Sequence, residues 1–152
     1  MIRDNEYVAR VIFEPKMVYH GVLLAPAFEL RASINESYLS VLRIDVESWK
    51  SDMVAIPTRK NRRLYGYAKM NVGEIRHIKL RRVDYDVGET ADTAMASHAG
   101  IFVKVNGEPL IGGKPLKTLP EGITEDFILL AIRNRLVELA QKGLCKLEEK
   151  LK

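Results

Sequence analysis

Three residues in separate segments could together act on an anionic substrate: His98, Arg31 and Arg43. A histidine side chain can serve as a general acid or base, so the imidazole of His98 is a candidate for that role. A pair of arginines suits a phosphate or carboxylate group, because each guanidinium offers a fork of N–H donors. The sequence predicts these three residues as catalytic candidates. The alternative is that His98 caps a turn or makes a buried hydrogen bond.

The segment from Arg59 to Arg82 holds the positive charge of the chain. It contains nine basic residues and one acidic residue, whereas the rest of the chain has fifteen basic and nineteen acidic residues. Charges gathered in this way repel one another, and binding to an anionic partner relieves that repulsion and releases counterions. The segment therefore predicts binding to nucleic acid or another polyanion.

A strand over residues 75–82 would place His77, Lys79 and Arg81 on one face. Nearby tyrosines could stack on bases between the basic side chains. The predicted contact residues are Arg59, Lys60, Arg62, Arg63, Arg76, Lys79, Arg81, Arg82, Tyr65 and Tyr67. The alternative is a solvated edge strand that its charges protect against aggregation, with the tyrosines filling the core.

No motif of high specificity identifies an enzyme or a cofactor. The three histidines lie far apart in sequence from one another and from the single cysteine, Cys145, so no metal site is predicted. The run Gly112-Gly113-Lys114 does not fit a phosphate-binding loop, because the pattern requires glycine at position 108 and Ser or Thr at 115. A small enzyme acting on a nucleotide, RNA or other phosphorylated substrate remains the alternative function, and its cofactor stays unknown.

Length and composition predict one globular domain over residues 1–152. Hydrophobic residues make up 47% and charged residues 29%, which is typical of folded domains. One cysteine cannot form an intramolecular disulfide and is typical of a reducing compartment, so the expected location is the cytoplasm. No apolar run approaches the roughly 20 residues of a membrane-spanning helix, so no membrane association is expected.

The candidate residues must be positioned by strands and two helices. The apolar, β-branched runs Tyr7–Phe13 and Tyr38–Ile44 predict buried strands, and Asn106-Gly107 predicts a tight hairpin turn. Asp45 could cap a short helix near 46–55, because apolar residues follow it at helical spacing.

A long amphipathic helix is predicted near 124–142, with Thr124 as its N-cap and acidic residues in its first turn. The chain order favours an α+β fold with a mostly antiparallel sheet, open or partly closed, and helices on one side. Apolar residues outside the main stripe of the helix, such as Phe127 and Leu130, leave a third function open. The chain could be a non-catalytic interaction or assembly subunit that binds a second copy or another protein.

Overall fold

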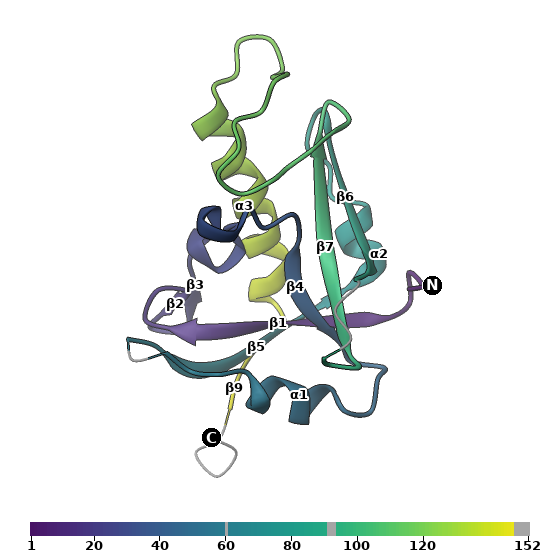
Figure 1. The fold of residues 1–152 in the computed structure, drawn as a ribbon, viewed down its shortest axis with the longest axis vertical. Helices are drawn as coiled ribbons and strands as arrows, with labels where there is room; N and C mark the ends of the chain where they lie inside the picture. Colours follow the sequence, from purple (N-terminus) through teal and green to yellow (C-terminus); the bar gives the residue numbers. More distant parts are fainter. Residues whose placement is uncertain (60, 91–93, 148–152) are drawn as a thin grey trace.

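The computed structural model describes residues 1–59, 61–90 and 94–147, and a seven-stranded antiparallel sheet organises them (Figure 1). The neighbours in the sheet run in the order β6-β7-β4-β1-β5-β9, and β8 pairs with β7. Its strands are β1 (Tyr7–Glu14), β4 (Leu39–Arg43), β5 (Arg63–Asn71), β6 (Val83–Glu89), β7 (His98–Val105), β8 (Glu108–Pro109) and β9 (Leu144–Lys146). The sheet is not closed, so the α+β prediction is confirmed in its open form.

The remaining elements are short strands and turns, two short helices and the long helix α3. They are β2 (Val18–Tyr19), β3 (Val22–Leu23), η1 (Ala25–Phe28), η2 (Ala32–Ile34), α1 (Trp49–Ala55), α2 (Val72–Arg76) and α3 (Glu125–Gln141). The strands β2 and β3 form a small hairpin of their own. No helix among the described residues is long and apolar enough to cross a membrane.

Both faces of the sheet are covered, because alternate residues of β1 point to opposite sides. Val8 and Ile12 belong to the larger core under α3, whereas Ala9 and Val11 belong to a second core with Trp49 and Met53 of α1. Figure 1 shows α3 and α1 on different sides of the sheet. The expectation that helices lie on one side is therefore wrong, and the apolar character of both strand faces is the physical reason.

The C-terminal helix forms where its capping signal predicts. The hydroxyl of Thr124 accepts a hydrogen bond from the Phe127 amide, and Ile128, Ile132 and Leu136 are buried along one side. Lys142 ends the helix, and the chain then reverses at Gly143 into β9, which pairs with β5. A Cβ on Gly143 would overlap the Lys69 carbonyl, so this close approach requires glycine.

The expected strand over residues 75–82 is wrong. Asn71 caps a short helix there, because its side chain accepts a hydrogen bond from the Glu74 amide and α2 continues to Arg76. The next strand, β6, begins only at Val83. His77, Lys79 and Arg81 therefore do not share the face of a strand.

Two other local predictions are confirmed, one of them with shifted bounds. Asn106 and Gly107 both adopt positive φ angles, 51° and 78°, in the turn between β7 and β8. The short helix α1 begins after Ser48 rather than at Asp45, because the intervening residues form turns that return to the end of β4.

Candidate functional site

Arg10 enters the gap where β1 and β4 separate. These strands pair only at Val8 and Ala9, whereas β1 pairs with β5 along its whole length. Beyond that point the guanidinium of Arg10 takes the place of strand pairing: Nε donates to the Ala27 carbonyl at 2.9 Å and Nη1 to the Ser40 carbonyl at 2.8 Å. A charged side chain is thus held inside an otherwise apolar strand.

The charge of Arg10 is poorly compensated. Burial lowers the pKa of Arg10 to about 10; the carboxylate of Glu36 opposes this shift, whereas the charges of Arg31 and Arg62 add to it. The positive charges of Arg31 and Arg62 thus act on Arg10, because charge interactions are weakly screened at a buried group. We call Arg10, Arg31 and Arg62 the arginine cluster.

Glu36 is the carboxylate that faces this cluster. It accepts hydrogen bonds from the Arg31 amide at 2.9 Å and from Arg31 Nη2 at 3.1 Å. Arg31 is the more exposed partner, with 53% of its side-chain surface accessible against 9% for Glu36. Glu36 therefore pairs with Arg31 and also acts on Arg10, so one carboxylate serves two guanidinium groups.

Arg62 forms the other side of the cluster. Its guanidinium carbon lies 3.8 Å from the centre of the Phe13 ring, and Nη2 donates to the Pro57 carbonyl at 3.3 Å. Burial and the charges of Arg59 and Arg31 lower the pKa of Arg62. Within the described residues, Arg62 Nε is the buried side-chain nitrogen or oxygen atom that has no hydrogen-bond partner. Buried polar atoms in proteins are almost always paired, so this N–H calls for an explanation.

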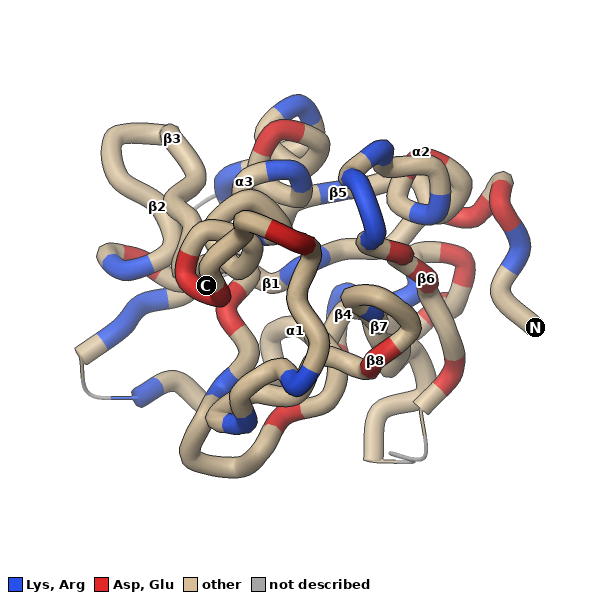
Figure 2. The backbone as a smooth tube through the Cα atoms, turned by 90° about the horizontal axis from the view of Figure 1, so that it is seen from above, with Lys and Arg blue, Asp and Glu red and all other residues tan. Residues whose placement is uncertain are grey.

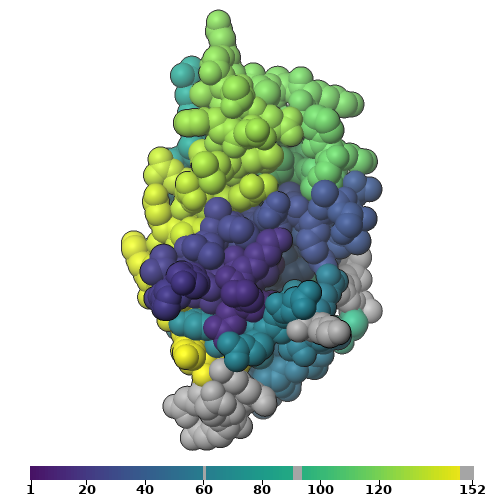
Figure 3. Space-filling model, turned by 90° about the vertical axis from the view of Figure 1, so that its left-hand side faces the viewer, coloured from purple at the N-terminus to yellow at the C-terminus, as the bar shows by residue number. Residues whose placement is uncertain are grey.

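The cluster draws on three segments that are distant in sequence. Figure 3 shows the chain of residues 20–36 (dark blue) on the same face as β1 (purple) and the chain before β5 (teal). The cluster includes two arginines that the polyanion prediction did not name, Arg10 and Arg31. The signal for Arg10 was a single arginine in the apolar strand Tyr7–Phe13.

Arg59 adds its charge to that of Arg62, whereas the described basic residues from Arg63 to Arg82 have other neighbours. Arg63 pairs with Glu14 at 3.2 Å, and Arg76 pairs with Asp4 and Asp86 while donating to two backbone carbonyls. Arg81 and Arg82 border a separate hollow beside Asn106 and the start of α3. Lys79 is exposed, and Lys60 lies outside the described residues. Figure 2 shows Lys and Arg on several sides of the molecule, with Asp and Glu between them.

The two tyrosines of the prediction face other side chains. Tyr67 meets Trp49 edge to face, with ring centroids 5.0 Å apart, and Tyr65 is half-buried against the larger core with Lys146 near its ring. Both residues therefore contribute to packing, as the alternative interpretation of this segment expected.

His98 takes part in a short chain of polar contacts on β7. Its Nε2 lies 3.2 Å from the Ser40 hydroxyl and its Nδ1 lies 2.6 Å from the Thr90 hydroxyl. The ring also meets Tyr38 edge to face at 5.8 Å. Because Ser40 also accepts from Arg10 through its carbonyl, this residue links His98 to the arginine cluster.

Arg43 projects from the opposite face of the sheet. Leu42 lies opposite His98 in the register, so His98 shares a face with Leu42, and the next residue, Arg43, points away. Arg43 donates to the buried carboxylate of Glu6 at 2.9 Å. Burial raises the pKa of Glu6, but hydrogen bonds from Arg3 and Arg43 outweigh that effect and lower it overall. The structure thus links His98 to Arg10 through Ser40, and it engages Arg43 in an ion pair with Glu6.

No group of three or more His, Cys, Asp or Glu residues gathers in the described part of the chain in a way that could hold a metal ion. No protein-family model, curated protein or solved structure matches the chain. Any assignment of function therefore depends on the chemistry of the site residues themselves.

Proposed function

We propose that the chain binds nucleic acid or another polyanion and that the arginine cluster holds one of its phosphate groups. The observation that carries this proposal is that Glu36, already paired with Arg31, is the carboxylate that acts on the buried Arg10, while a buried N–H of Arg62 has no partner in the described part of the chain. The proposal keeps the basic segment's Arg59 and Arg62 and adds two arginines from the N-terminal third of the chain.

Physical chemistry favours an anion at this position. Moving a charged side chain from water into the protein interior costs about several kcal/mol unless the charge is paired and hydrogen-bonded there. A phosphate group presents several acceptor oxygens, and guanidinium groups bind it through short, charge-assisted hydrogen bonds. One phosphate could accept from Arg62 Nε and offset the repulsion within the cluster.

The test compares two arginines of the same segment. Fluorescence anisotropy with labelled single-stranded RNA, single-stranded DNA and duplex DNA, at two salt concentrations, would measure affinity for the nuclease-treated protein. Arg62→Gln should weaken binding about tenfold and reduce the salt slope by about one, as expected for one lost phosphate contact. Arg81→Gln is the matched control, because Arg81 is exposed and borders the separate hollow by α3.

Three outcomes would reject the proposal. The protein could fail to bind any of the three nucleic acids and inorganic pyrophosphate at low salt. Arg62→Gln and Arg81→Gln could weaken binding equally, which would indicate a diffuse surface effect. Arg62→Gln could also leave affinity and salt slope unchanged, which would remove the cluster from the interface.

The contacts of His98 favour a second candidate function, an enzyme acting on a phosphorylated substrate. A serine hydroxyl beside an imidazole, with a third group at the other ring nitrogen, is the arrangement used to activate a nucleophile. Here Ser40 would lose its proton to His98 Nε2 while Nδ1–H donates to Thr90. His98→Ala should then abolish turnover of a phosphorylated ester and leave nucleic-acid affinity intact, whereas equal turnover in both proteins would reject this candidate.

A further inference from the structure

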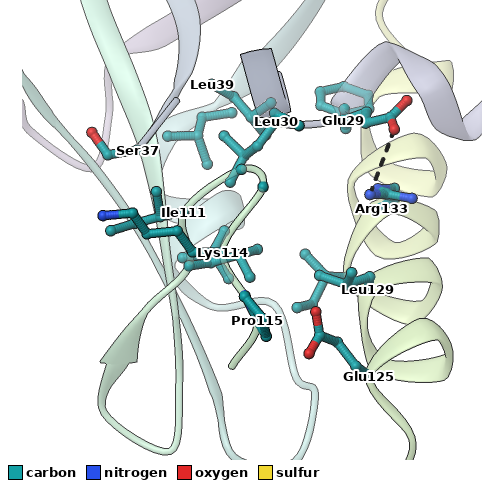
Figure 4. A pocket seen from close by; sticks show the side chains of 18 residues that line it. Glu29, Leu30, Ser37, Leu39, Ile111, Lys114, Pro115, Glu125, Leu129 and Arg133 are labelled. Atoms are coloured by element: carbon teal, nitrogen blue, oxygen red, sulfur yellow. Dashed lines mark ion pairs between the residues drawn. The ribbon is translucent and has the colours of Figure 1, made fainter. Parts of the chain in front are cut away.

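A second hollow lies between the sheet and α3, away from the polar contacts of His98. It has a volume of about 300 Å³ and is partly open to solvent. Residues of η1, β4 and β7 form one side, α3 forms another, and the loop through Gly112 and Gly113 closes a third (Figure 4). We call it the α3 pocket.

The floor of the α3 pocket belongs to the hydrophobic core. Leu39, Ile101 and Ile132 line it and are only 2%, 0% and 2% exposed. Figure 4 shows Leu39 and Leu30 on the sheet side facing Leu129 on the helix side across the space. This apolar floor offers water few hydrogen-bond partners, so an apolar group that covers it would be stabilised by the surface it buries.

The walls are held in place without a ligand. The Gly112 amide donates to the Glu36 carbonyl at 2.8 Å, and a Cβ on Gly112 would lie 2.6 Å from the Arg31 carbonyl oxygen. Gly113 adopts a φ of +79°, which favours glycine. This loop is therefore fixed against η2, so the pocket needs no rearrangement to form.

Charges of both signs lie around the rim and balance one another. Arg133 faces Glu29 at 4.0 Å, Glu125 accepts from the Leu116 amide at 3.1 Å, and Lys114 brings a second positive charge. Two acidic and two basic side chains give no net field that would select an anion or a cation. The apolar floor is thus the feature that selects a ligand.

We propose that the α3 pocket binds a small uncharged molecule with an aromatic or aliphatic body. An apolar protein cavity of roughly 150 Å³ accommodates benzene, so this space fits a body of about two fused rings or a comparable alkyl group. The Ser37 hydroxyl, which lines the pocket, offers one polar group to such a ligand. This proposal does not rest on the arginine cluster or on any phosphate, although the backbone of Arg31 and Glu36 contacts the Gly112 loop.

The experiment uses indole as the probe and methyl NMR spectra of the full chain as the readout. Leu129→Trp should fill the pocket and abolish binding, whereas Leu130→Trp is the matched control, because Leu130 is 49% exposed and does not line the pocket. The expected result for the wild type is saturable shifts of the Leu39, Ile101 and Ile132 methyl groups. Leu130→Trp should reproduce these shifts, and Leu129→Trp should lose them.

Two results would overturn the proposal: no saturable shift in the wild-type spectrum at millimolar indole, or shifts centred on methyl groups outside the pocket. Should Leu129→Trp fail to fold, the wild-type shift map decides by itself. Competition with inorganic pyrophosphate adds a further check, because an anion that binds the arginine cluster should leave indole affinity unchanged. The two proposals can therefore fail separately.

Discussion

The hydroxyl of Ser97 donates a 2.6 Å hydrogen bond to the carboxylate of Asp52, which ties the start of β7 to α1. The Ser97 amide donates to the same oxygen at 3.2 Å, and the Ser48 hydroxyl donates to it at 3.0 Å. Ser97 is fully buried and immediately precedes His98. This carboxylate therefore fixes the position from which the His98 ring reaches Ser40 and Thr90.

Asp52→Asn should destabilise the protein and change its response to acid. The hydrogen bonds of Ser97 lower the pKa of Asp52 despite its partial burial. A lowered folded-state pKa gives stability that is present above the unfolded value, near 4, and is lost as the pH falls through the folded value. Urea unfolding should show a loss of about 1–3 kcal/mol for the variant at pH 7, as for other hydrogen bonds to charged groups. That loss should shrink below pH 4, and a loss independent of pH would contradict this account.

Gly143→Ala should open the edge of the sheet at β9. The added Cβ would overlap the Lys69 carbonyl, and the Lys69 amide donates to the Gly143 carbonyl at 2.9 Å. Hydrogen exchange at the Lys69 and Leu147 amides should accelerate, because both pair across this edge. Gly107→Ala is the control, since space around Gly107 is open and its positive φ of 78° adds only local strain. Equal exchange at Lys69 in the two variants would reject the prediction.

Thr124→Ala should cost about 1 kcal/mol, the usual value of an N-cap hydrogen bond. The variant loses the hydrogen bond from the Phe127 amide but keeps the buried side of α3. The free energy of unfolding from urea titration measures the loss. Thr118→Ala serves as a control, because Thr118 is exposed in the loop before the helix. An effect no larger than that of the control would mean that packing alone fixes the start of α3.

The features that sequence predicts well are those whose signal is local. The cap at Thr124, the Asn106-Gly107 turn and the apolar run of β1 each depend on a few neighbouring residues, and all three are confirmed. The strand expected over 75–82 is wrong because the Asn71 side chain accepts a hydrogen bond from the Glu74 amide and thereby caps a helix that begins at Val72. The strand β9 was missed because its three residues gain order only by pairing with β5.

The candidate site was predictable only in part. The sequence indicates an excess of positive charge in segment 59–82, but the acidic partners of Arg63 and Arg76 come from distant segments, and only the fold shows which arginines remain poorly compensated. His98 has polar contacts with Ser40 and Thr90, but these neighbours lie on another strand or just beyond one, so sequence order alone does not reveal them. Arg10 is the one charged residue in the apolar run Tyr7–Phe13. A count of charges along the chain overlooks it, because that count favours segments with many basic residues.

Arg10→Met and Arg76→Met should differ in stability, because Arg10 makes no ion pair within the described residues, whereas Arg76 makes two. Arg76 pairs with Asp4 and Asp86, and these partners raise its pKa although burial opposes them. Removing it leaves two backbone carbonyls without their donor, whereas the largely exposed Asp4 and Asp86 remain solvated, so the loss should be about 1–2 kcal/mol. Arg10→Met removes a buried and poorly compensated charge along with two hydrogen bonds, and these effects offset each other to within about 1 kcal/mol.

The two variants should also differ in how far pyrophosphate stabilises them. Pyrophosphate should raise the melting temperature of the wild type and of Arg76→Met, because a ligand that binds the folded state stabilises it by mass action. It should leave Arg10→Met unchanged, since the cluster then lacks its central guanidinium. Differential scanning fluorimetry with increasing pyrophosphate, with sodium chloride at matched ionic strength as the control, measures both effects. A ligand-induced shift of equal size in Arg10→Met would place the anion elsewhere on the molecule.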